Sequence, residues 1–190
     1  MGPGRVQSRE FEYKRHGTLC LTANLEVWCG WVIAPTIGLT RTEEDFARHI
    51  EQTIAADPLA GWVFIVDNLN THQSESLVLA VAAWCGIEAD LGEKGKSGVL
   101  QSQASRAEFL SDLSHRIRFV YTPKHSSWLN QIEIWFSILV RKLLKRSSFK
   151  SLEELRERIV AFIEYFNRTM AKPIDWLYSP RPLHQETSTG

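Results

Sequence analysis

Two acidic residues stand out from the 190-residue sequence because each one interrupts an apolar segment. Asp67 follows a continuous apolar run, residues 62–66, whose β-branched and aromatic side chains are typical of a strand buried on both faces. Glu133 lies in the apolar register of a predicted helix, where a carboxylate is costly to desolvate unless a positive group compensates it. Together the two acids could bind a divalent cation, since Mg²⁺ prefers oxygen ligands and often takes only one or two carboxylates.

Each of these residues also has a structural interpretation. Asp67 could cap the helix that follows it, and Glu133 could turn its carboxylate to solvent or pair with a lysine. His72 and His125 lie close to the two acids in sequence. They could position water or contact a phosphate, or they could make structural hydrogen bonds only. The residue pattern by itself leaves these alternatives open.

Three long segments resemble the catalytic domain of insertion-sequence transposases, in the superfamily that also contains the mariner elements: IVDNLNTH, FVYTPKHSSWLNQIEIWFSILVRKLLKRSSF and YFNRTMAKPIDWLY. The segment REFEYKRHGTLCL resembles the hairpin that follows the first catalytic strand of that family. The resemblance covers roughly residues 4–178. It implies a ribonuclease H-like fold with an Asp-Asp-Glu or Asp-Asp-Asp triad that uses Mg²⁺ or Mn²⁺. Asp67 matches the second aspartate of the triad and Glu133 its terminal glutamate.

One part of the family pattern has no match in the sequence. The family's first aspartate lies on a strand upstream of the hairpin, whereas no Asp ends an apolar strand before Asp67. We therefore expect an N-terminally truncated domain that lacks its first, central strand and is inactive as this fragment. Asp67 and Glu133 are also 66 positions apart, which is longer than is typical of the superfamily, and residues 86–116 account for the excess.

The charge of the chain is zero overall but unevenly distributed. Residues 1–114 hold nine Lys and Arg against fifteen Asp and Glu, a net charge of −6, whereas residues 115–190 hold thirteen against seven, a net charge of +6. Such asymmetry is a hint of polyanion binding. The candidate DNA-binding residues would contact the phosphate backbone without reading sequence, or would form an ordinary solvated surface: Lys124, His125, Arg141, Lys142, Lys145 and Arg146.

Composition indicates one globular domain, over residues 1–178, followed by a polar tail over residues 179–190; 44% of the residues are hydrophobic and seven are tryptophan. The three cysteines have no CxxC spacing, which favours reduced thiols in a cytoplasmic protein. No apolar stretch approaches the ~20 residues that span a bilayer. The segment DLGEKGKS is not a phosphate-binding loop, because Asp90 stands where the first glycine is required.

Periodicity predicts an α/β domain of three layers with a mixed sheet. We expect strands at residues 10–13, 18–27, 31–37, 61–67 and 117–121, with the second and third antiparallel. Helices are expected at residues 42–56 and 74–85, within 123–149, and from residue 151 to about 166, and residues 86–116 are the least regular region.

The function expected from the resemblance is that of a DNA transposase catalytic domain, which nicks DNA and transfers strands by metal-dependent phosphoryl transfer. Its partners would be double-stranded DNA and a second copy or full-length transposase subunit, in the bacterial cytoplasm and on the nucleoid. One alternative is a non-catalytic DNA-binding or regulatory fragment. The other is a different ribonuclease H-like nuclease that obtains its third carboxylate elsewhere.

Overall fold

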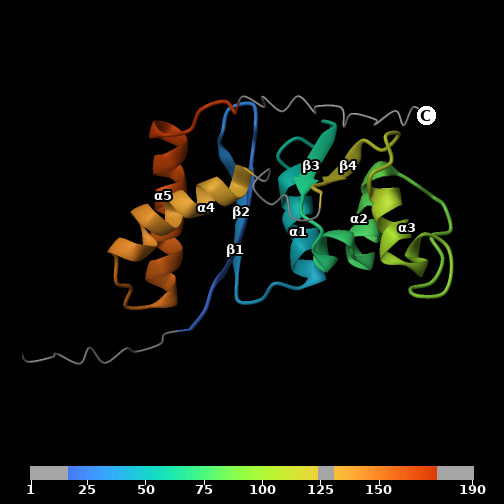
Figure 1. Ribbon diagram of the computed structural model, residues 1–190, viewed down its shortest axis with the longest axis horizontal. Helices are drawn as coiled ribbons and strands as arrows, with labels where there is room; N and C mark the ends of the chain where they lie inside the picture. The colour runs from blue at the N-terminus through green and yellow to red at the C-terminus, as the bar shows by residue number, and fades with distance from the viewer. Residues whose placement is uncertain (1–16, 124–130, 175–190) are drawn as a thin grey trace, which may run out of the picture.

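The computed structural model describes residues 17–123 and 131–174, which form the α/β structure that the sequence predicts (Figure 1). The strand expected at residues 10–13 and the tail at residues 179–190 lie outside this part of the chain. The helices and strands, in chain order, are β1 (Cys20–Leu25), β2 (Val32–Gly38), α1 (Glu43–Ile54), β3 (Trp62–Val66), η1 (Asn70–Gln73), α2 (Glu75–Cys85), η2 (Val99–Gln101), α3 (Gln103–Leu110), β4 (Ile117–Tyr121), α4 (Gln131–Lys142), η4 (Leu144–Arg146) and α5 (Leu152–Thr169).

The strands form two separate two-stranded sheets. β1 pairs antiparallel with β2, as predicted, and the register shifts between Thr22 and Asn24. β3 pairs in parallel with β4, and Val66 lies opposite Tyr121 at the carboxyl end of the pair. Over residues 17–123 and 131–174, no strand pairs with the second edge of β1 or of β3, so these four strands alone do not make one mixed sheet.

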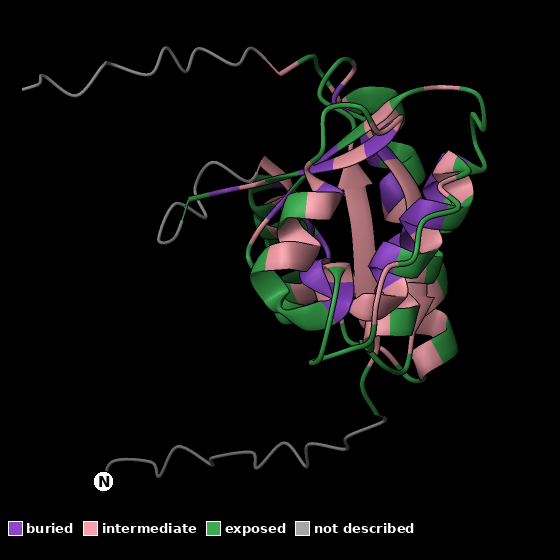
Figure 2. Ribbon diagram, turned by 90° about the vertical axis from the view of Figure 1, so that its right-hand side faces the viewer, coloured by how far each residue is buried: buried purple, intermediate pink, exposed green. Residues whose placement is uncertain are grey.

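Two groups of buried apolar side chains hold these elements together. One packs α1, α2 and α3 against β3 and β4, and the other packs α4 and α5 against β1 and β2 (Figure 1). The buried residues are marked in Figure 2. Each fully buried aliphatic or aromatic side chain contributes about 1.5–3 kcal/mol. The largest fully buried apolar side chains are Trp135 of the second group and Phe119, Ile50, Leu77, Leu110 and Ile117 of the first.

The helices that flank β3 begin and end at the residues that the sequence marks. Thr42 caps α1 in a capping box, in which Thr42 Oγ1 accepts from the Asp45 amide at 3.2 Å and Asp45 Oδ2 accepts from the Thr42 amide at 3.0 Å. Ser74 caps α2, and Gly86 ends it in the left-handed conformation with φ 66°. These local signals fix where the chain enters and leaves the segment that carries Asp67.

Residues 86–116 are more ordered than predicted. They contain α3, whose capping box joins Ser102 to Ser105 in place of the usual Glu or Gln at the third position. Lys94 of this segment has its Nζ 3.4 Å from Glu43 and 3.0 Å from Glu75. Two partly exposed ion pairs therefore join the segment to Glu43 of α1 and Glu75 of α2.

The helix predicted within residues 123–149 is shorter than its apolar pattern. α4 ends at Lys142, and a short 3₁₀ turn, η4, follows. Trp135, Leu139 and Leu143 are the buried residues of this segment, and Trp135 is the most buried of the three. Because Trp135 packs edge-on against Phe166 of α5, it sets how α4 lies on the rest of the fold.

Candidate functional site

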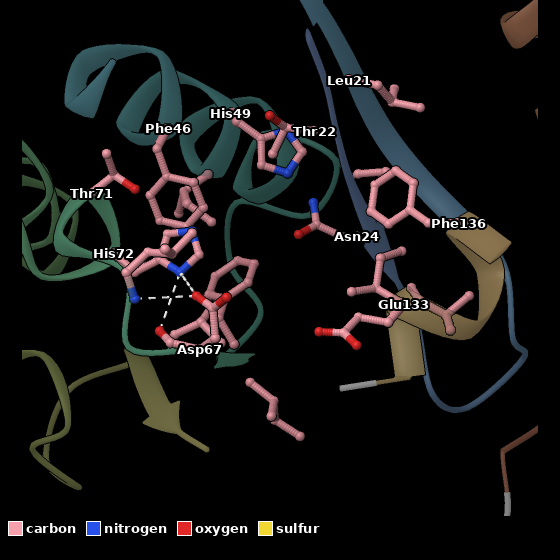
Figure 3. A pocket seen from close by; sticks show the side chains of 18 of the residues that line it. Leu21, Thr22, Asn24, Phe46, His49, Asp67, Thr71, His72, Glu133 and Phe136 are labelled. Carbon is pink, nitrogen blue, oxygen red and sulfur yellow. Dashed lines mark hydrogen bonds and ion pairs between the residues drawn. The ribbon is translucent and has the colours of Figure 1, made fainter. Parts of the chain in front are cut away.

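A cavity of about 320 Å³ lies between the two halves of the structure and is lined by β1, β3, α1 and α4. Asp67 enters it from the end of β3, and Glu133 enters it from the first turn of α4. Figure 3 shows the Glu133 carboxylate turned toward the side of the cavity on which Asp67 lies. The two acids singled out by the sequence therefore face one space, although β3 and α4 pack in different cores.

Asp67 is held by its own loop. One carboxylate oxygen, Oδ1, accepts from the Leu69 amide at 3.2 Å and lies 2.8 Å from Nδ1 of His72. The first contact is an Asx turn, which shapes the chain before η1. Because Ser74 is the cap of α2, the alternative in which Asp67 caps that helix is wrong. The Asp67 side chain remains 37% exposed, so it is available to a ligand in the cavity.

His72 is fixed on several sides. Its ring packs against Phe46 of α1, tilted by 34° with a centroid separation of 4.2 Å, and its carbonyl accepts from Tyr121 Oη at 2.8 Å. Burial lowers the pKa of His72, and the nearby Asp67 carboxylate opposes that shift only in part. At neutral pH the His72 ring is therefore uncharged, and its contact with Asp67 is a hydrogen bond from a neutral imidazole.

Glu133 is positioned by the buried face of its helix. Trp135 and Leu139 anchor α4 in the core, and Glu133 stands on the exposed side. Among the residues that the structure describes, no Lys or Arg lies within ion-pair distance of its carboxylate. The alternative in which Glu133 pairs with a lysine thus has no support over these residues.

Two further polar residues of the cavity were not predicted. Asn24 of β1 donates to Thr53 Oγ1 at 2.7 Å, and His49 Nδ1 lies 3.0 Å from Thr36 Oγ1. Burial, with a smaller effect from His72, lowers the pKa of His49 to about 4. His49 is three residues after Phe46, on the buried face of α1. That position in the sequence was the available signal that the His49 side chain is buried at the cavity.

The cavity offers a divalent cation two carboxylates. Over residues 17–123 and 131–174, no group of three or more His, Cys, Asp and Glu side chains surrounds a common metal position. Asp67 and Glu133 are nevertheless hard oxygen donors that face one cavity, and Mg²⁺ is commonly held by one or two carboxylates with water completing its shell. These residues fit such an ion as a partial ligand set.

Comparison with protein families gives this arrangement a context. The model of the DDE superfamily endonuclease family matches residues 1–156, which is most of the chain and includes both acids. The chain belongs to the DDE superfamily endonucleases. Members of this superfamily act on DNA and generally use divalent metals. Comparisons with curated proteins and with solved structures found no match.

The basic residues of this DDE endonuclease domain gather after the site. Arg141 and Lys142 end α4, Lys145 and Arg146 belong to η4, and all four are exposed. We call these four residues the α4 basic cluster. Lys124 and His125, predicted to act with them, lie outside the described residues. None of the helices described is long and apolar enough to cross a membrane.

Proposed function

We propose that this DDE endonuclease domain is the catalytic domain of a mariner-related insertion-sequence transposase, which nicks and joins DNA strands by phosphoryl transfer. The observation that carries the proposal is the convergence of Asp67 and Glu133, 66 residues apart in sequence, on one cavity. Asp67 follows a buried parallel strand, the position at which open α/β sheets usually bind ligands.

In this proposal Asp67 and Glu133 hold Mg²⁺ or Mn²⁺ from opposite sides of the cavity. The bound ions would activate the attacking hydroxyl or water and stabilise the leaving oxygen. Asp67 is suited to its role because its loop holds it before an ion arrives, and Glu133 because a helix anchored by Trp135 carries it. The α4 basic cluster would hold the DNA backbone without reading its sequence.

We also assign the described strands to a ribonuclease H-like sheet in which one further strand lies between β1 and β3. Both strands line the cavity, and Val63 of β3 leaves half of its surface exposed there. A strand ending in Asp that paired with both edges would bring the third carboxylate.

The test is a plasmid-nicking assay on the chain alone and on the chain fused to the segment encoded directly upstream. The fusion should nick DNA with Mg²⁺ or Mn²⁺, and Asp67→Asn or Glu133→Gln should each lower the rate at least 100-fold. Glu51→Gln is the matched control, because Glu51 is exposed on α1 and lies outside the cavity. Its rate should equal that of the unmodified fusion.

The outcomes separate the alternatives. Nicking that survives in both Asp67→Asn and Glu133→Gln would refute the site. DNA binding by the fusion without metal-dependent nicking would favour a regulatory, non-catalytic protein. Nicking by the 190-residue chain alone, lost in Glu133→Gln, would keep the site and refute the need for a further strand.

A further inference from the structure

In the loop after β3, one histidine makes two contacts with the candidate metal ligand Asp67. His72 Nδ1 lies 2.8 Å from Asp67 Oδ1 and 3.2 Å from the Asp67 carbonyl oxygen. Both of these oxygens are acceptors, so Nδ1 must carry the ring proton. The tautomer of His72 therefore follows from the geometry, and the same N–H group faces both acceptors of one residue.

The remaining contacts hold both the ring and the backbone of His72. The ring packs against Phe46, its carbonyl accepts from Tyr121 Oη, and its amide donates to the Leu69 carbonyl at 3.0 Å. The side chain is only 17% exposed. The ring is therefore held by Phe46 and by its own Nδ1 contacts to Asp67, and the other two contacts hold the backbone that carries it.

The two carboxylate oxygens of Asp67 therefore differ in their contacts. Oδ1 accepts from His72 and from the Leu69 amide, whereas Oδ2 has no hydrogen-bond or ion-pair partner among the residues described. The carboxylate cannot rotate to exchange its oxygens without breaking both contacts to Oδ1. Oδ2 is thus kept free for the cavity (Figure 3).

We propose that His72 is a positioning residue for metal binding by this domain: its Nδ1–H group fixes the Asp67 carboxylate so that Oδ2 faces the ion. This inference rests on the proposed function, because it takes Asp67 to be a ligand. Partners that orient a metal ligand typically contribute 10–100-fold to metal affinity, and His72 is expected to contribute by the same route.

The test uses the 190-residue chain and two readouts other than activity. The first is the ring tautomer of His72, read from long-range ¹H–¹⁵N NMR correlations. The second is Mn²⁺ affinity, followed by paramagnetic broadening of the Leu69 amide signal during a titration. The proposal expects the Nδ1–H tautomer and a Mn²⁺ affinity that depends on Asp67.

The variants separate positioning from packing. His72→Phe keeps a ring to pack against Phe46 but removes the donor, and it should weaken Mn²⁺ binding 10–100-fold. His72→Asn places an amide N–H near the position of Nδ1 and should restore the affinity to within a few-fold. His115→Phe is the matched control, because His115 also packs on a phenylalanine ring but lies outside the cavity.

Each outcome decides one question. The Nδ1-unprotonated tautomer, or equal Mn²⁺ affinity in His72→Phe and the unmodified chain while Asp67→Asn binds more weakly, would overturn the positioning role alone. Mn²⁺ broadening that is the same in Asp67→Asn as in the unmodified chain would overturn the proposed metal site and the positioning role with it. A loss of affinity in His72→Asn as large as that in His72→Phe would count against the Nδ1–H donor as the group that positions Asp67.

Discussion

Protonation of His49 should destabilise the fold in mild acid. His49 is 1% exposed and lies in the wall of the cavity, with Nδ1 3.0 Å from Thr36 Oγ1. Its Nε2 has no hydrogen-bond partner among the described residues, so nothing there compensates a positive charge on the ring. Burial is the main reason that the pKa of His49 falls from 6.5 to about 4.

The sign of the effect follows from proton uptake. Between pH 6.5 and pH 4 the unfolded chain binds a proton at His49 and the folded chain does not, so the free energy of unfolding falls as the pH falls. A difference of about 2.5 pKa units corresponds to about 3 kcal/mol. That is a large share of the 5–15 kcal/mol typical of a domain. His72, whose pKa is also lowered by burial, acts in the same direction.

The assay is urea unfolding, followed by tryptophan fluorescence, at a series of pH values from 7 to 4. Because other groups also titrate in this range, the unmodified chain is compared with His49→Asn, which keeps a polar group near Thr36 Oγ1. The variant should be less stable at pH 7, and the difference between the two free energies of unfolding should shrink by about 3 kcal/mol by pH 4. A difference that stays constant over this range would refute the reasoning.

Three other predictions concern the packing of α5, the DNA surface and the third carboxylate. Asn167→Ala should lower the free energy of unfolding by about 1–3 kcal/mol in urea melts. The Asn167 side chain accepts from the N–H of the buried Val32 at 2.8 Å and donates to its carbonyl at 2.9 Å. A smaller loss than in an exposed Asn→Ala control would contradict this prediction. Binding to any DNA duplex, measured by fluorescence anisotropy, should fall steeply as the salt concentration rises. The double substitution Lys142→Glu and Lys145→Glu should weaken binding equally for duplexes of unrelated sequence. Binding that is unchanged at about 0.3 M salt would exclude the α4 basic cluster as the DNA surface. A strand-forming peptide that ends in Asp, added in trans, should increase solubility and Mg²⁺-dependent nicking together. A gain in only one of them would contradict a single strand that supplies both pairing and the carboxylate.

Local signals in the sequence were sufficient for most of the elements. Thr42 with Asp45, and Ser74 with Gly86, mark the ends of α1 and α2 because capping depends on residues a few positions apart. The apolar run before Asp67 likewise predicts β3, because the pattern of a buried strand is formed by neighbouring residues. α3 was missed because its capping box pairs two serines, a weaker pattern than Ser with Glu.

Burial on α4 was harder to predict. The four-residue spacing of Leu139 and Leu143 gives the correct face, but Trp135 lies at its margin in the pattern and at its centre in the structure. The reason is tertiary: α5 supplies Phe166 as an edge-on partner for the indole ring, and no feature within α4 indicates that partner. The exposed position of Glu133 follows from this packing.

The relation between Asp67 and Glu133 could not be predicted from either segment, because β3 and α4 pack in different cores. Polar contacts between α1 and the antiparallel sheet join the two cores: Asn24 to Thr53, and Thr36 to His49. The first spans 29 positions of sequence, so no periodic or capping pattern encodes it. Asp67 in turn meets α1 through the ring of His72, which packs against the helix one turn before His49. The same helix therefore sets the width of the cavity and supports one wall of the candidate metal site, so a substitution that loosens α1 should weaken metal binding even when both carboxylates are intact.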